Sequence, residues 1–174
     1  MSAIQTIETK LDEIFVKNAP ALPTNGKKAL VKYLPWINLV LGLLTLYSAY
    51  LLWHWAHYAN ALINYANSYG ALYGGPTIST DRMNFGLWLA LVFLIIESVI
   101  YLAAFPATRK RQKRGWDLMF YAVLVNIVYA VIVAFTRYGG VGSLLFGLIG
   151  VAIGLYLLFQ IRASYLKLGS GKKA

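Results

Sequence analysis

The chain has 174 residues, of which 59% are hydrophobic and only 13% are charged, with a formal net charge of +10. Soluble domains usually carry about a quarter charged residues, so this composition excludes an ordinary soluble globular protein. The apolar residues occur in long runs with the charges between them, which is typical of an all-α integral membrane protein. No cysteine is present, which excludes disulfides, iron–sulfur clusters and thiol catalysis.

Residues 1–18 have the periodicity of an amphipathic N-terminal helix, with one apolar stripe and the acidic residues mostly on the opposite side. The net charge of this segment is about minus one, whereas a helix that binds anionic lipid is normally basic. Docking on a protein is therefore favoured, with shallow interfacial seating as the alternative. Pro20, Pro23 and Gly26 predict a linker over residues 19–32. The apolar stripe consists of Ile4, Ile7, Leu11, Ile14 and Phe15.

Four apolar segments follow, and each is close to the ~20 residues needed to cross ~30 Å of hydrocarbon. Together they predict a transmembrane domain over residues 33–162, built as a four-transmembrane-helix bundle. Pro106 is expected to end the second span. The predicted spans are residues 33–55, 85–105, 116–135 and 141–161.

The segment after the first span, residues 56–73, is predicted to be helical and to lie outside the membrane. Asn60, Asn64 and Asn67 recur at intervals of four and three, so they share one helical face. Two alternatives remain open: a continuation of the first helix, or a separate amphipathic helix at the outer interface. Either one is a natural place for a partner to bind.

The basic residues predict the orientation of the chain. Under the positive-inside rule, basic clusters before the first span, between the second and third spans, and in the tail over residues 163–174 place both termini in the cytoplasm. We therefore expect a multi-pass protein of an inner or plasma membrane, without nucleic-acid binding. A contact with anionic lipid is compatible with the central cluster and secondary to its topological role. That cluster consists of Arg109, Lys110, Arg111, Lys113 and Arg114.

Glu97 is an acidic residue deep inside a predicted span, ~18 Å from its outer end at helical rise. A carboxylate at that depth is costly, so it normally faces protein or water. Four polar residues at similar depth predict a candidate intramembrane polar site with it. This site either joins helices by hydrogen bonds or binds a proton, an ion or a ligand. The four are Thr45, Ser48, Asn126 and Tyr129.

Small residues recur at intervals of four, three and four along the fourth span, at Ser143, Gly147, Gly150 and Gly154. Such a stripe permits close approach of another helix, so it predicts tight helix packing. The partner helix belongs either to the same chain or to a second copy. Gly42 and Ala49 of the first span are seven apart and could receive it.

The two histidines, His54 and His57, lie three positions apart near the outer end of the first span. They are weak candidates for a metal site, which would need a third ligand such as Asp81. Trp53, Trp55 and Tyr58 are typical of an aromatic belt at a membrane interface, and that interpretation is favoured. No metal and no other cofactor is predicted.

The chain contains no dinucleotide or P-loop glycine motif, no nucleophile elbow and no zinc-protease motif, so it is predicted to be non-enzymatic. The function favoured is that of a structural or accessory subunit, which packs with itself or with partner membrane proteins among the lipids. The alternative is a small oligomeric transporter or channel with Glu97 on the permeation path.

Overall fold

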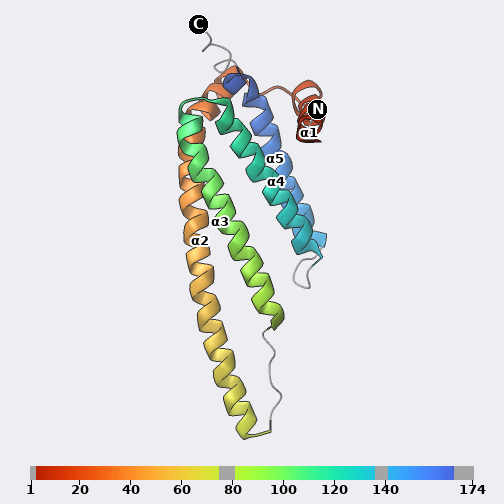
Figure 1. Cartoon of the computed structure of the whole chain (residues 1–174). Helices are drawn as coiled ribbons and strands as arrows, with labels where there is room; N and C mark the ends of the chain where they lie inside the picture. The colour runs from red at the N-terminus through yellow and green to blue at the C-terminus, as the bar shows by residue number, and fades with distance from the viewer. Residues whose placement is uncertain (1–2, 75–80, 136–140, 167–174) are drawn as a thin grey trace.

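The protein is described here by a computed structural model, which covers residues 3–74, 81–135 and 141–166. Every regular element in these ranges is helical (Figure 1). They are α1 (Ala3–Asp12), the short π-helix η1 (Glu13–Lys17), α2 (Thr24–Leu72), α3 (Asp81–Arg109), α4 (Lys113–Ala134) and α5 (Val141–Leu166).

Four of these helices, α2 to α5, are long and apolar enough to span a membrane. Large apolar side chains cover their outer surfaces: Leu43, Val99 and Ile153 are each more than half exposed. A surface of this kind is unfavourable in water and suits contact with lipid or with another apolar helix. The all-α fold with four candidate membrane helices, predicted from the composition, is confirmed.

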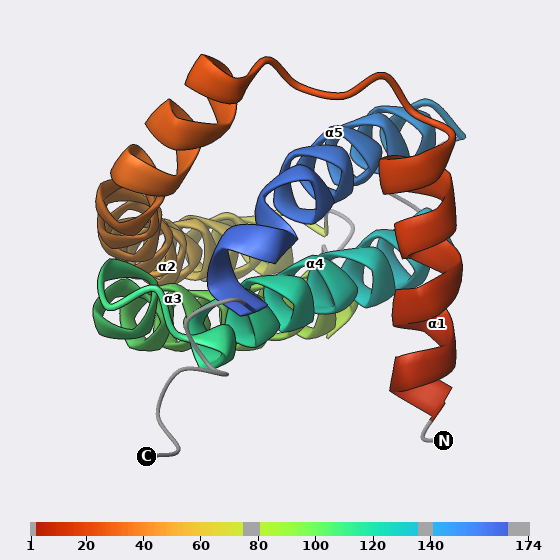
Figure 2. The same cartoon turned by 90° about the horizontal axis from the view of Figure 1, so that it is seen from above.

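The helices pack as two neighbouring hairpins, one of α2 and α3 and the other of α4 and α5, joined by a tight turn between α3 and α4 (Figures 1 and 2). α1, that turn and the C-terminal end of α5 lie together at one end of the bundle, called the terminal end below. The opposite end, where Leu72 and Ala134 end α2 and α4, is called the loop end.

α2 is far longer than its neighbours. It has 49 residues, against 22 in α4 and 26 in α5, and at 1.5 Å per residue it extends for about 73 Å. It projects well beyond the loop ends of α4 and α5 (Figure 1). Of the two alternatives for residues 56–73, the structure has the continuation of the first helix.

Two boundaries differ from the sequence-based prediction. α2 begins at Thr24, so the irregular link is confined to residues 18–23 rather than 19–32. Its first turns are inclined to the rest of the helix (Figure 2), in keeping with Pro35 inside it. Pro106 does not end α3, which continues to Arg109. A proline removes one helical hydrogen bond, and in this last turn the chain tolerates that loss.

The turn between α3 and α4 ends α3 with paired backbone groups. The backbone N–H of Arg111 donates to the Thr108 carbonyl, and that of Gln112 donates to the Ala107 carbonyl, both at 2.9 Å. This is a Schellman cap, and Arg111 takes its left-handed position with φ 50°. Gly115 follows so closely that a Cβ there would lie 2.6 Å from the Thr108 nitrogen.

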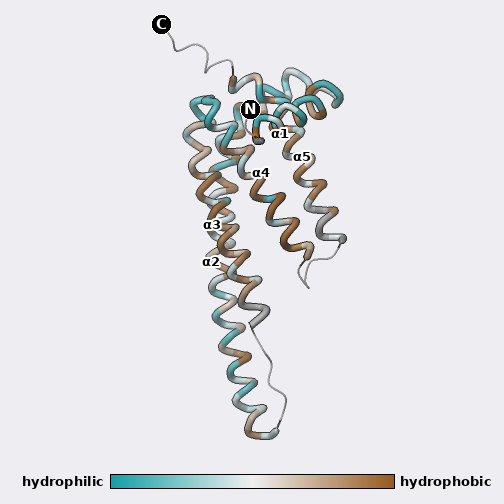
Figure 3. The backbone as a smooth tube through the Cα atoms, turned by 45° about the vertical axis from the view of Figure 1, so that its right-hand side comes forward, coloured by the Kyte–Doolittle hydropathy of each residue, from teal (hydrophilic) through white to brown (hydrophobic). Residues whose placement is uncertain are grey.

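The buried core lies toward the terminal end, where α2, α4 and α5 meet. The Trp116 indole donates to the Leu158 carbonyl at 2.9 Å, which satisfies the one polar atom of a fully buried ring. Hydrophobic residues fill the middle of the bundle, while the projecting part of α2 alternates between polar and apolar (Figure 3). The core residues are Val31, Leu34, Trp116, Phe120, Leu155, Leu158, Phe159, Ile161 and Tyr165.

Candidate functional site

Glu97 is half-buried on α3, one turn from Phe93 and one turn from Tyr101. The Phe93 ring contacts the Tyr129 ring of α4, with centroids 5.0 Å apart. Residues four apart share a helical face, so Glu97 lies on the side of α3 that faces α4. Among the residues that the structure describes, none forms a hydrogen bond or an ion pair with its carboxyl group.

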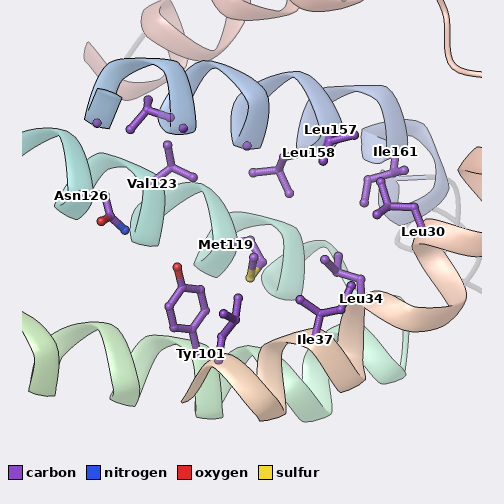
Figure 4. Close-up of a pocket in the computed structure, with 15 residues that line it drawn as sticks. Leu30, Leu34, Ile37, Tyr101, Met119, Val123, Asn126, Leu157, Leu158 and Ile161 are labelled. Atoms are coloured by element: carbon purple, nitrogen blue, oxygen red, sulfur yellow. The ribbon is translucent and has the colours of Figure 1, made fainter. Parts of the chain in front are cut away.

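Tyr101 joins this group from the same face of α3, and the sequence-based prediction missed it. Its hydroxyl is directed toward the Asn126 side chain of α4 (Figure 4). The Asn126 amide also donates to the Ala122 carbonyl at 3.2 Å. Glu97, Asn126 and Tyr129 therefore lie along one interface between α3 and α4, and Tyr101 could have been found by its spacing of four from Glu97.

Thr45 and Ser48 are not brought to this interface. The Thr45 hydroxyl donates to carbonyls of its own helix, those of Leu41 at 2.9 Å and Gly42 at 3.1 Å, and Ser48 is exposed. A threonine in a helix can satisfy its hydroxyl locally in this way, so similar depth alone does not bring it to Glu97. The polar contact between α2 and α3 is made instead by buried Ser98, which donates to the Gly42 carbonyl at 3.0 Å.

A second buried polar contact joins α2 to α3 nearer the terminal end. The Asn38 amide nitrogen donates to the Thr108 hydroxyl at 3.3 Å, and both side chains are fully buried. The carbonyl oxygen of Asn38 has no hydrogen-bond partner among the described residues. This pair ties α2 to α3 at the base of the α3–α4 turn.

A cavity of about 450 Å³ lies between α2, α4 and α5, with Tyr101 of α3 at its edge (Figure 4). Its lining is mainly aliphatic, and Tyr101 and Asn126 supply its polar groups. Gly147, Gly150 and Gly154 form part of the α5 wall. The site can therefore hold an apolar chain or side chain, with one amide and one phenol available to a polar atom.

The small-residue stripe of α5 is not packed against a helix of the same chain where it is described. A Cβ placed on Gly150 or Gly154 meets no atom within 4 Å, and one on Gly147 approaches only Ala130, at 3.7 Å. Gly42 instead admits Leu102 of α3, 2.8 Å from the position of its Cβ. The side chain of Ser143 lies outside the described part, and packing against a second copy stays a prediction.

The N-terminal segment docks on α5 of its own chain. The Arg162 guanidinium binds Asp12 at 2.9 Å and Glu8 at 3.3 Å, and it lies over the Trp116 ring, 5.2 Å from the ring centre. Glu8 and Asp12, predicted to lie mostly opposite the apolar stripe, point toward Arg162. The sequence analysis did not predict this pairing with a cation from a distant part of the chain.

Backbone contacts extend this docking along the link. The Gln160 amide donates to the Phe15 carbonyl at 2.8 Å and accepts from the Leu22 backbone N–H at 3.2 Å. The Tyr156 hydroxyl donates to the Pro20 carbonyl at 2.7 Å. Together with Arg162, these contacts are called the N-terminal latch below.

The remaining candidates are placed as follows. The five basic residues at 109–111 and 113–114 are all exposed around the α3–α4 turn, and Lys113 pairs with Asp117 at 3.5 Å.

His54 contacts the Tyr50 and Tyr58 rings, while His57 packs on Trp53, with ring centres 4.3 Å apart. No group of three or more metal-ligating side chains occurs among the described residues, which do not include the side chain of Asp81.

Comparison with known proteins adds no relative from which a role could be carried over. No protein-family model, no curated protein and no solved structure matches this chain.

Proposed function

We propose that this chain is a non-enzymatic structural or accessory subunit of a membrane, which assembles with itself or with a partner membrane protein. The observation that carries the proposal is the projecting part of α2. Leu62, Tyr65 and Leu72 are each more than 60% exposed there. A long helix that leaves large apolar and aromatic side chains uncovered is typical of a binding surface.

The proposed orientation has the terminal end in the cytoplasm. The five exposed basic residues around the α3–α4 turn lie at this end, together with the N-terminal latch. The positive-inside rule places such a cluster on the cytoplasmic side, so the projecting part of α2 would lie on the outer side. In this orientation the uncovered surface is offered to the extracellular or periplasmic side.

The proposal is tested by measuring the size of the assembly taken directly from its membrane. The full chain, with an affinity tag after Ala174, is cross-linked with a lysine- and tyrosine-reactive agent and then extracted in a mild detergent. We expect complexes that contain a second copy or another membrane protein. A chain that is recovered only as a monomer, both with and without cross-linking, would contradict the proposal.

A second candidate function is supported by Glu97, an acidic group on the α3–α4 face without a hydrogen-bonded or ionic partner among the described residues. A carboxyl group inside a membrane helix is a candidate for proton or ion transfer. Its setting favours the structural role, because the adjacent cavity is mainly aliphatic and carries no second ionisable side chain except tyrosine. Loss of pH-dependent flux in a Glu97→Gln variant would favour transport.

A further inference from the structure

The uncovered face of α2 has a regular seven-residue repeat. From Leu44 onward, nine residues recur at alternating intervals of four and three, a mean period of 3.5, and all but Ser48 are aliphatic or aromatic. This period is that of a left-handed coiled coil, in which two helices pack side by side along one seam. The residues, called the α2 seam, are Leu44, Ser48, Leu51, Trp55, Tyr58, Leu62, Tyr65, Tyr69 and Leu72.

The seam lies on the side of α2 that α3 does not cover. α3 packs on the opposite face, where the Trp53 and Trp88 rings meet edge to face at 5.4 Å and Asn60 lies near Leu87. At 100° per residue, Trp53 and Asn60 are roughly opposite Trp55 and Leu62. Trp55 and Leu62 are each 68% exposed. The packing of the hairpin therefore leaves the seam free for another helix.

Among the residues that the structure describes, no segment covers the seam. α4 and α5 stop far short of the end of α2, and α1 is held at the terminal end by the N-terminal latch (Figure 1). The seam is therefore open to a helix from another molecule.

Three features favour a second copy of this chain as that molecule. No Asp, Glu, Lys or Arg occurs between Lys32 and Asp81, so two α2 helices meet no like-charge repulsion along the seam. Small residues flank the seam at Ala59, Ala61, Ala66 and Ser68, which allows close approach around the tyrosines. Two copies inserted in the same orientation bring equal depths of α2 side by side, so identical repeats fall into register.

We propose that two copies of this chain associate through a parallel α2–α2 coiled coil along the α2 seam, with α3 on the outside of each. The seam continues beyond the loop end of α4 and α5, so in the proposed orientation its outer half lies on the outer side of the membrane. There the burial of Tyr58, Leu62 and Tyr65 stabilises the pair. The inference rests on the proposed structural role and deepens it, because it names the partner and the surface.

The test uses the absence of cysteine from the chain, since a single introduced cysteine can form a disulfide only with another molecule. Leu62→Cys and Tyr69→Cys place the thiol on the seam, and Asn64→Cys is the matched control on an exposed position of the same helical segment, away from it. The full-length variants are oxidised in native membranes with copper–phenanthroline, and dimer is measured on non-reducing gels. We expect the two seam variants to dimerise at least ten times faster than Asn64→Cys.

The other outcomes separate this inference from the proposed function. If the seam variants form no dimer but the cross-linked native assembly contains a different protein, the inference is overturned and the structural role stands. Equal dimerisation at all three positions also overturns it, because random collision would then account for the disulfides. Recovery of monomer alone in both experiments overturns the inference and the proposed function together.

A second pair of variants tests whether the residue at position 62 contributes to the seam, with the cysteine kept at position 69 as the reporter. In a Tyr69→Cys background, Leu62→Asn places a polar amide in the seam, whereas Asn64→Ser changes an exposed residue outside it. We expect Leu62→Asn to lower the rate of disulfide formation at Tyr69→Cys about tenfold and Asn64→Ser to leave it unchanged. An equal rate of disulfide formation in the Leu62→Asn and Asn64→Ser variants contradicts the proposed register.

Discussion

Arg162 links the N-terminal segment to the rest of the molecule through charge and through aromatic contacts. Its guanidinium binds two carboxylates and lies over Trp116, and its side chain is 23% exposed. Partial burial weakens the screening by salt that reduces most surface ion pairs. Its acidic partners lie far away in the sequence, with Asp12 150 residues earlier and Glu8 four residues before that. No local pattern could have predicted that pairing.

We expect Arg162→Gln to release α1 and η1 while the membrane helices stay folded. Charge-assisted hydrogen bonds contribute about 1.5–3 kcal/mol each, and the pairs here are partly exposed, so we expect a loss of about 1–2 kcal/mol. This corresponds to roughly a tenfold faster amide hydrogen exchange over residues 3–17. The matched control, Arg114→Gln, changes an exposed basic residue and should leave that exchange unchanged. Equal protection in both variants would contradict a latch centred on Arg162.

At the scale of elements, the helices were predictable from the sequence and their ends were less so. Four consecutive apolar runs of about 20 residues are rare in soluble proteins. The number and order of the long helices therefore followed from composition and periodicity. The continuity of α2 was left open because residues 56–72 contain neither a proline nor a charged break, and Asn60, Asn64 and Asn67 fit either alternative. The prediction that Pro106 ends the second span is wrong, because α3 passes through it to a Schellman cap that depends on the following residues.

The turn between α3 and α4 gives a sharp test of this packing. We expect Gly115→Ala to destabilise the protein by about 1–3 kcal/mol, because the added Cβ meets backbone atoms of Ala107 and Thr108 that cannot move aside as a side chain can. Gly154→Ala is the control, since nothing lies within 4 Å of its Cβ position. Thermal unfolding in detergent should show a clear drop in Tm for Gly115→Ala and almost none for Gly154→Ala. Similar values for the two variants would contradict the close approach.

At the scale of the whole molecule, the candidate polar site was predictable in part. Glu97, Asn126 and Tyr129 do share the α3–α4 interface, since residues at similar depth on neighbouring helices meet when the helices pack side by side. Thr45 and Ser48 do not reach it, because depth along a helix says nothing about the direction of a side chain around its axis. Tyr101 lay within one turn of Glu97 and was missed because tyrosine is common in membrane helices.

The structural role predicts that Glu97 does not support transport by the whole molecule. We expect Glu97→Gln to leave the pH-dependent proton flux of proteoliposomes the same as that of the unaltered chain, within a factor of two. Glu13→Gln, an exposed acid of η1, controls for the loss of one negative charge. A flux that is present in the unaltered chain and in Glu13→Gln but abolished in Glu97→Gln would favour the transport function instead.

The unequal lengths of the four long helices also affect how the protein meets bilayers of different thickness. Charged side chains resist entry into hydrocarbon, and in α2 they occur only in the first turns, up to Lys32. The remaining α2 residues carry no such barrier, and only rings such as Trp53, Trp55 and Tyr58 mark a preferred depth. A thicker bilayer would therefore meet less resistance along α2 at the loop end than at the terminal end, where the charged residues lie.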